Sequence, residues 1–209
     1  MAEAREPRLV LATRNAGKLR ELRELLRGQV PGLDVDTQVI DAATAGAPDV
    51  VESGGTFEEN ALLKAAQTAR ATGLIAVADD SGLAVDVLGG APGIFSARWA
   101  GRHGDDAANL ELLLAQLADI PAGRRGAAFV CAAALATPDG QLEHTERGEL
   151  RGALLTGARG DGGFGYDPIL VPAGMDRSCA QLAPAEKNAI SHRGIAFRAL
   201  LPHLVSALS

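Results

Sequence analysis

Residues able to bind an anion gather first at Thr13-Arg14-Asn15-Ala16-Gly17-Lys18, between an apolar run and a helical pattern. A turn from a strand into a helix presents free backbone N–H groups and the positive end of the helix dipole, which suit a phosphate. Thr13 and Asn15 add side-chain donors, and Lys18 adds charge. The glycine and lysine spacing of a Walker A loop is absent. An ordinary turn with a capping Asn is the alternative interpretation.

Carboxylates form the second cluster, Asp79-Asp80-Ser81-Gly82, directly after the apolar run 74–78. Acidic residues at the C-terminal end of a buried strand are well placed to hold a hard cation. Neighbours in a strand point to opposite faces, so only one aspartate faces a given pocket unless the chain bends. Glu52, in a loop before a predicted helix, is a second candidate metal ligand. A solvated turn and a surface glutamate are the alternatives.

Two further clusters lie in the last third of the sequence. Glycines and two aromatic residues share the segment 162–168, where the backbone could approach a flat ligand and a ring could stack on it. The segment 187–194 combines Lys187, His192 and Arg193, whose donors suit carbonyl or phosphate oxygens. A flexible loop and a solvated helix start are the alternatives. The remaining histidines, His103, His144 and His203, are interpreted as isolated structural or surface residues.

Charge and composition exclude several classes of function. The sequence has 20 Lys and Arg against 26 Asp and Glu, a net charge of -6, so it lacks the basic field of a non-specific nucleic-acid binder. Its longest apolar stretch, 126–137, is too short to span a membrane, and the mixed charges of residues 1–8 indicate no signal peptide. Cys131 and Cys179 make no disulfide framework. We therefore expect a cytoplasmic protein that binds neither nucleic acid nor membrane.

Lysine is scarce, since only Lys18, Lys64 and Lys187 occur and all other basic residues are arginine. Lysine supplies a compact ammonium that arginine does not. Either these three positions need that group, or the usage is drift.

Apolar periodicity predicts the elements that must position these residues. Thr56 and Glu59 fit a capping box for a helix that Gly73 ends, and Pro138-Asp139-Gly140 predicts a hairpin turn. Strands are predicted over 8–12, 35–40, 74–78, 83–88, 127–136, 141–150 and 169–171, and helices over 19–26, 56–72, 106–117 and from 186, the last over 190–201. This order predicts one α/β domain, residues 1–209, with a mixed sheet.

Five segments together resemble the inosine/xanthosine triphosphate pyrophosphatase family. They are ATRNAGK, ESGGTFEENALLKA, ADDSGLAVDVLGGAPGIFSARWAG, GGFGYDP and EKNAISHRG, in the family's order over almost the whole chain. The resemblance implies an elongated mixed-sheet α/β fold with two lobes around a central substrate cleft, and a homodimer. It implies Mg²⁺-dependent hydrolysis of dITP, ITP, XTP and dXTP to the monophosphate and pyrophosphate.

The same resemblance implies roles for individual residues. Asp80 would bind Mg²⁺ and accept a proton from the attacking water, with Glu52 as a second metal ligand and Ser81 touching the substrate. The triphosphate would be bound by Thr13, Asn15, Gly17, Lys18 and Lys64. The base would be held by Phe164, Gly165, Tyr166 and Asp167 and recognised by Lys187, His192 and Arg193. Arg14, where the family commonly has a smaller residue, and Gln181, where it often has Glu, depart from the pattern.

Other functions stay open at this point. A pyrophosphatase for other modified nucleotides, pyrimidines included, would use similar chemistry, and a non-catalytic nucleotide sensor would bind without cleavage. A dinucleotide-dependent oxidoreductase is disfavoured, because the glycine fingerprint and its ribose-binding acid are absent.

Overall fold

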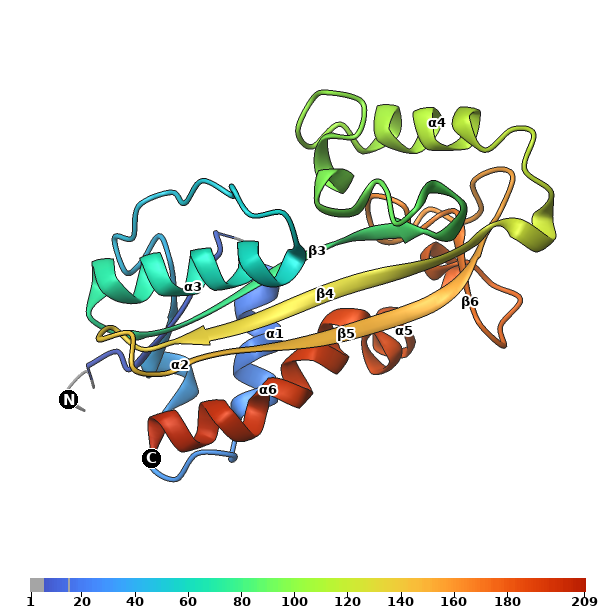
Figure 1. The fold of residues 1–209 in the computed structure, drawn as a ribbon. Helices are drawn as coiled ribbons and strands as arrows, with labels where there is room; N and C mark the ends of the chain where they lie inside the picture. The colour runs from blue at the N-terminus through green and yellow to red at the C-terminus, as the bar shows by residue number, and fades with distance from the viewer. Residues whose placement is uncertain (1–5, 15) are drawn as a thin grey trace. The chain divides into compact units, whose positions relative to one another are not determined.

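A six-stranded mixed sheet organises the computed structural model, which describes residues 6–14 and 16–209 (Figure 1). The strand order is β2-β1-β3-β4-β5-β6. β1 pairs in parallel with β2 and β3, whereas β5 and β6 are antiparallel. The strands are β1 (Leu9–Leu11), β2 (Val39–Asp41), β3 (Ile75–Val85), β4 (Gly126–Ala136), β5 (Glu143–Leu154) and β6 (Leu170–Pro172). The predicted α/β class with a mixed sheet is confirmed.

Six α-helices accompany these strands in the described part of the chain. They are α1 (Ala16–Leu26), α2 (Val35–Gln38), α3 (Phe57–Thr72), α4 (Asp106–Gln116), α5 (Pro184–Ile190) and α6 (His192–Leu208). None of the helices within the described ranges has the length and apolar content to cross a membrane.

Contacts divide the chain into two compact units. Unit 1 comprises residues 1–80, 132–147 and 195–209, and unit 2 comprises residues 81–131 and 148–194. Strands β3, β4 and β5 each contribute residues to both units. That residues 1–209 act as one domain stays a prediction.

Unit 1 packs helices on both faces of its strands. Helix α3 covers one face, and α1 and α6 cover the other (Figure 1). The side chains of β1 are fully buried, as their uniformly apolar sequence predicts. Helix α3 begins as expected: the Thr56 hydroxyl accepts a hydrogen bond from the Glu59 N–H at 3.1 Å. Gly73 ends it in the left-handed conformation, at φ 70°.

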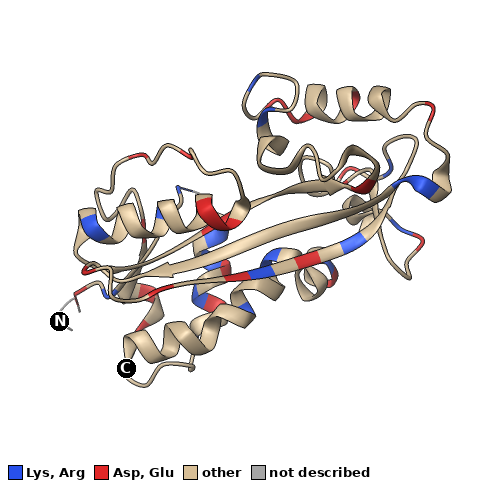
Figure 2. Ribbon diagram, in the orientation of Figure 1, with Lys and Arg blue, Asp and Glu red and all other residues tan. Residues whose placement is uncertain are grey.

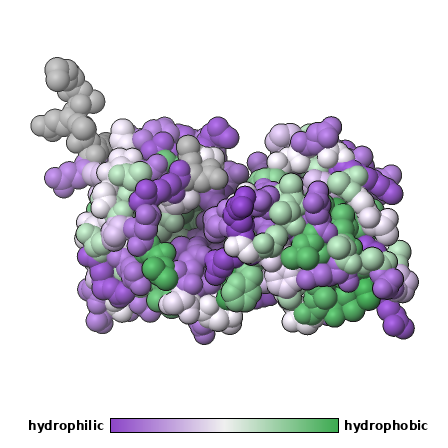
Figure 3. Space-filling model, turned by 90° about the horizontal axis from the view of Figure 1, so that it is seen from above, coloured by the Kyte–Doolittle hydropathy of each residue, from purple (hydrophilic) through white to green (hydrophobic). Residues whose placement is uncertain are grey.

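The core of unit 2 contains one cluster of apolar side chains and one buried arginine. Leu83, Leu113 and Ile169 are fully buried in that cluster. The Arg125 guanidinium is 3% exposed and donates to the carbonyls of Leu117, Ile120 and Leu155, so its charge is hydrogen-bonded within the core. Unit 2 also has apolar side chains at its surface, which the hydropathy view shows as green areas (Figure 3).

The strands β4 and β5 differ in charge because they differ in position. Strand β4 lies between β3 and β5, is buried along almost its whole length and carries no charge. Strand β5 lies beside the three-residue β6, so most of it forms an edge, and acidic and basic residues are spaced along it (Figure 2). Charges on an exposed edge oppose pairing with another chain.

Local capping overrides part of the predicted secondary structure. Residues 35–40 are a helical turn followed by β2, because Asp34 accepts from the Asp36 N–H and the Gln38 side chain accepts from the Asp34 N–H. The single strand predicted there was wrong. The last helix starts at His192 rather than at 190 and ends at Leu208 rather than at 201. Ser191 caps its start, since the Ser191 hydroxyl accepts from the Gly194 N–H at 3.0 Å.

Strand β3 is longer than predicted. It does not end at residue 78 but continues through both aspartates to Val85. A 3-10 turn over residues 86–88 then replaces the second half of the predicted strand 83–88. The long strand is possible because the carboxylates of Asp79 and Asp80 each have a partner on the face they occupy.

Replacing Thr56 by Ala tests the capping of α3. We expect the free energy of unfolding to fall by about 1 kcal/mol, because the Glu59 N–H loses its acceptor. Urea denaturation followed by circular dichroism measures this change. Thr56→Ser, which keeps the hydroxyl, is the control and should stay near wild type; equal losses in both variants would contradict the capping role.

Candidate active site

Two adjacent aspartates of β3 serve opposite faces of the sheet. Asp79 is 4% exposed, and its Oδ2 accepts from Lys18 Nζ of α1 at 2.7 Å. The Asp80 carboxylate accepts from Asn60 Nδ2 of α3 at 3.2 Å and lies 3.7 Å from Lys64 Nζ. Since α1 and α3 cover opposite faces (Figure 1), the expectation that only one aspartate faces a given pocket is confirmed.

Lys64 brings two carboxylates together. Its Nζ is 2.6 Å from Glu52 Oε1 and 3.7 Å from Asp80 Oδ1. All three side chains are largely but not fully buried, with 15% of Lys64, 31% of Glu52 and 12% of Asp80 exposed. We call Glu52, Asn60, Lys64 and Asp80 the carboxylate group. Helix α3 helps to bring the group together, because Asn60 and Lys64 lie one turn apart on it.

The loop that carries Glu52 is held against the first turn of α3. The Gly54 N–H donates to Asn60 Oδ1 at 2.8 Å, and the Gly55 N–H donates to Glu59 Oε2 at 2.6 Å. A Cβ on residue 54 would lie 2.7 Å from Glu59 Cβ, so only glycine allows this approach. Asn60 therefore binds the loop with its oxygen and Asp80 with its nitrogen.

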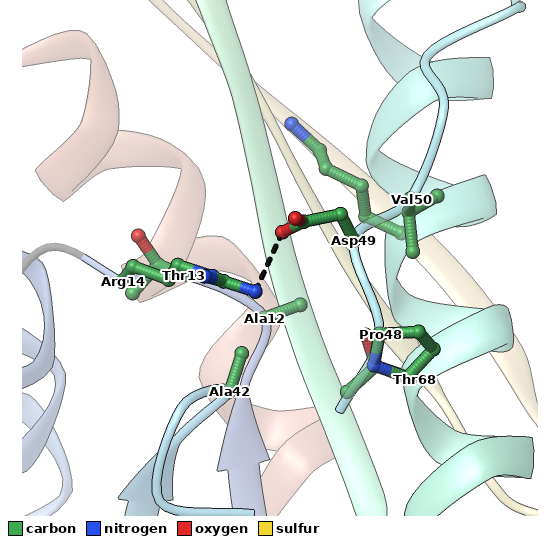
Figure 4. A pocket seen from close by; sticks show the side chains of 9 residues that line it. Ala12, Thr13, Arg14, Ala42, Pro48, Asp49, Val50 and Thr68 are labelled. Carbon is green, nitrogen blue, oxygen red and sulfur yellow. Dashed lines mark ion pairs between the residues drawn. The ribbon is translucent and has the colours of Figure 1, made fainter. Parts of the chain in front are cut away.

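An open pocket of about 160 Å³ adjoins the carboxylate group through Lys64. Thr13 and Arg14 line it from the turn after β1, and Asp49 lines it from the loop before α3 (Figure 4). An ion pair of 2.8 Å joins the exposed Arg14 and Asp49 side chains. The other lining residues are Ala12, Ala42, Pro48, Val50 and Thr68. Polar groups from three segments thus surround one opening.

Two of the predicted phosphate residues, Thr13 and Lys64, line this pocket. Thr13 lines it, and its carbonyl accepts from the Ala42 N–H at 3.1 Å. Gly17 and Lys18 belong to the first turn of α1. Asn15 lies outside the described residues, so the structure does not test its role.

The donor set of the carboxylate group fits a divalent cation. Carboxylate oxygens of Glu52 and Asp80 both approach the positively charged Lys64 Nζ, at 2.6 and 3.7 Å. Hard cations such as Mg²⁺ bind through carboxylates of this kind.

A second group of predicted residues meets within unit 2. Asp167, 3% exposed, accepts from Lys187 Nζ at 2.5 Å and from the Phe164 N–H at 2.8 Å. Lys187 Nζ lies 5.0 Å from the centroid of the Phe164 ring, and that ring is 76% exposed. A Cβ on Gly163, at φ +73°, would strike the Asp167 carboxylate. The loop thus holds an aromatic face open beside an ammonium, a suitable surface for a flat ligand.

Neighbouring residues of the same loop have structural partners. Tyr166 is buried and its hydroxyl donates to the Ser96 carbonyl at 2.9 Å; burial and the Asp106 charge raise its pKa. The Gly165 N–H donates to Asp106. Burial, with a further contribution from Asp167, raises the pKa of the Cys179 thiol to about 11, so this cysteine is protonated at neutral pH and is no nucleophile.

Three other predicted site residues lie in β3 and α6. Ser81 follows Asp80 in β3 and is half-buried. His192 begins α6, and its ring stacks on Phe129 with centroids 5.2 Å apart. Arg193 is the next residue of the same helix and is half-buried. Gln181, one of the departures from the family pattern, caps a 3-10 turn by accepting from the Ser178 N–H.

Sequence reasoning missed one residue of the group and misjudged two histidines. Asn60 is 1% exposed and was not predicted; a polar residue one turn before Lys64 in a capped helix was the available signal. His144 and His203 are not isolated, because their rings stack with centroids 3.5 Å apart. The sequence could not indicate this pair, since β5 and α6 are distant in the chain.

Comparison with known proteins places the chain in a family. The sequence model of the Ham1 family matches residues 9–203. The chain belongs to the Ham1 family. It is 65% identical over 195 residues to a dITP/XTP pyrophosphatase of Streptomyces avermitilis, covering 93% of this chain and 96% of the relative. It is 55% identical over 199 residues to a dITP/XTP pyrophosphatase of Mycobacterium tuberculosis, covering 95% and 96%.

Solved structures of Ham1 proteins have the same fold. A HAM1 protein from Coxiella burnetii matches with a TM-score of 0.86 and 40% identity over 96% of this chain and 99% of that one. A structure from Mycobacterium abscessus, described as a nucleoside-triphosphatase and dITP/XTP pyrophosphatase, matches with a TM-score of 0.77 and 51% identity over 93% and 99%. The family predicted from the five motifs is therefore confirmed.

Asp167→Asn tests the buried pair in this Ham1 chain. The amide keeps the shape but removes the charge opposite Lys187, so we expect unfolding free energy to fall by about 1–3 kcal/mol. Urea denaturation measures it. The control is Asp161→Asn, an exposed position in the same loop, which should change stability little. An Asp167 variant as stable as that control would show that the pair contributes nothing.

Proposed function

We propose that the chain hydrolyses noncanonical purine nucleoside triphosphates, dITP, ITP, XTP and dXTP, to the nucleoside monophosphate and pyrophosphate. The observation that carries the proposal is the convergence of Glu52 and Asp80 on Lys64 beside the pocket lined by Thr13. Carboxylates and an ammonium at one opening suit the hydrolysis of a phosphoanhydride. The dITP/XTP pyrophosphatases among the relatives support the substrate class.

Charge balance favours a metal in this reaction. A nucleoside triphosphate carries about four negative charges near neutral pH, as its phosphate groups ionise. Glu52 and Asp80 bring negative charge to the site, and Lys64 only partly offsets it. We propose that Glu52 and Asp80 hold Mg²⁺. When bound, the ion would polarise the phosphoryl group and favour attack by water.

The chain's own residues would position the nucleophile and the phosphates. Asp80 accepts the proton of the attacking water, and the Asn60 amide orients its carboxylate. Lys18 and Lys64 bind phosphate oxygens, which stabilises the negative charge on the departing pyrophosphate. Asp79 acts through Lys18: its buried carboxylate holds the ammonium of this residue, which lies in the first turn of α1.

Recognition of the base is assigned to the second group. Phe164 stacks on the purine, and Lys187 and Arg193 donate to the carbonyl at C6 of hypoxanthine or xanthine, with His192 beside them. Adenine has an amino group there and would meet these donors with another donor, which costs several kcal/mol, on the order of an unmade buried hydrogen bond or two. Tyr166, Asp167 and Gly165 shape the loop.

Three further properties belong to the proposal because the resemblance implies them. They are the use of Mg²⁺ rather than another divalent ion, assembly as a homodimer, and a cytoplasmic location.

Release of pyrophosphate from dITP, XTP, dGTP, dATP and dUTP, with Mg²⁺ and with EDTA, tests the function. We expect metal-dependent release from dITP and XTP and little from dGTP and dATP. Release from dUTP instead would contradict the assignment of the base site. Binding of dITP without release would favour a nucleotide sensor and overturn the proposal.

Asp80→Asn tests the role of the carboxylate. The amide cannot accept the proton, so we expect kcat for dITP to fall by about 10²- to 10⁴-fold, the usual contribution of a general base. Steady-state kinetics measures kcat, and circular dichroism checks the fold. Asp119→Asn, an exposed position, is the matched control. Wild-type kcat in the Asp80 variant would remove this residue from the mechanism.

A further inference from the structure

A group of metal-binding residue types lies away from the carboxylate group. His144 and Glu146 belong to β5 and His203 belongs to α6. Within the described ranges, they are the group of three His, Cys, Asp or Glu residues whose ligand atoms all lie within 4.8 Å of one another. We call them the histidine group. Its members come from none of the elements that supply Glu52, Asn60, Lys64 and Asp80.

Strand geometry explains why the three side chains meet. His144 and Glu146 are two residues apart in β5 and so point to the same face. Arg147 points to the other face, where it pairs with Glu58 of α3 at 2.8 Å. Helix α6 covers the face of His144 and Glu146 (Figure 1) and brings His203 to them.

Both imidazole rings aim a nitrogen at one carboxylate oxygen. His144 Nε2 is 2.9 Å from Glu146 Oε1, and His203 Nε2 is 3.8 Å from the same oxygen. The rings stack at an interplanar angle of 27°. Two nitrogens and one oxygen therefore converge on a small volume, in the manner of three ligands on one side of a metal ion.

We propose that His144, Glu146 and His203 bind a transition-metal ion of the Zn²⁺ class. Zinc–ligand bonds of about 2.0–2.1 Å with tetrahedral angles place ligand atoms about 3.4 Å apart. The two Nε2–Oε1 distances, 2.9 and 3.8 Å, lie on either side of this value. Binding also needs the stacked rings, whose centroids are 3.5 Å apart, to move apart so that both nitrogens point at one ion.

The exposure of the group allows the ion to enter and to keep a water ligand. The side chains of His144 and Glu146 are 32% exposed and that of His203 is 42% exposed. Three protein ligands and one solvent position complete a tetrahedron. Imidazole ligands favour Zn²⁺, Co²⁺, Ni²⁺ and Cu²⁺, whereas Mg²⁺ prefers oxygen ligands. The histidine group therefore selects a different ion from the one proposed for Glu52 and Asp80.

A bound ion would connect β5 to α6. Because the folded chain holds the three ligands together and the unfolded chain does not, binding stabilises the folded state. At a free Zn²⁺ concentration 100 times Kd, this linkage raises the melting temperature by about 5–10 °C.

Titration of the untagged, EDTA-treated chain with CoCl₂ tests the site. We expect one equivalent of Co²⁺ to give visible d–d absorption bands, which ZnCl₂ then abolishes by displacement. His203→Ala should weaken Co²⁺ binding by at least about 10-fold, because even residues that only support metal ligands are worth 10- to 100-fold. Glu146→Gln, which preserves size, should weaken it as well.

Two controls separate this site from the rest of the chain. His103→Ala removes an exposed histidine elsewhere and should bind Co²⁺ as the wild type does. Asp80→Asn should also retain the absorption bands, whatever its effect on hydrolysis. The proposal is overturned if the wild type shows no saturable Co²⁺ binding, if His203→Ala binds as tightly as the wild type, or if Asp80→Asn abolishes the bands.

Discussion

Burial of carboxylates on β3 is the constraint on which the candidate active site depends. Asp79 and Asp80 follow the apolar first residues of β3, and a buried carboxylate without a partner is strongly unfavourable. Each face of the strand must therefore supply its own cation or donor. Lys18 of α1 meets this need on one face, and Asn60 and Lys64 of α3 meet it on the other. The need to pair these carboxylates therefore explains why α1 carries Lys18 and α3 carries Asn60 and Lys64 where they face β3.

The same pairing accounts for the scarce lysines. Lys18 pairs with Asp79, Lys64 with Glu52 and Lys187 with Asp167, in every case at 2.5–2.7 Å. Each ammonium lies beside a carboxylate that is largely removed from water. A compact ammonium suits these positions, where a planar guanidinium would need more donors to be satisfied.

Much of the fold was predictable because it follows from local signals. Apolar runs, the Thr56 cap and Gly73 placed α3, β1 and β4 nearly correctly. The failures have local and tertiary causes. Asp34 and Gln38 capped a helical turn within an apparent strand. At residues 79–80, paired carboxylates allowed β3 to continue where charge alone suggested its end. The motifs identified the family, yet Asn60 was missed because its role needs partners from two other segments.

The sequence by itself determined the element types, the family and the residues that carry charge in it. Those are set by side-chain periodicity and by motif order, which are properties of neighbouring residues. Only the tertiary structure decided which groups meet: Glu52 with Asp80 at Lys64, and His144 with His203 at Glu146. These contacts join residues of strands, helices and loops that sheet pairing and packing bring together. Spacing along the chain does not predict these contacts, because they depend on how the whole chain buries its side chains when it folds.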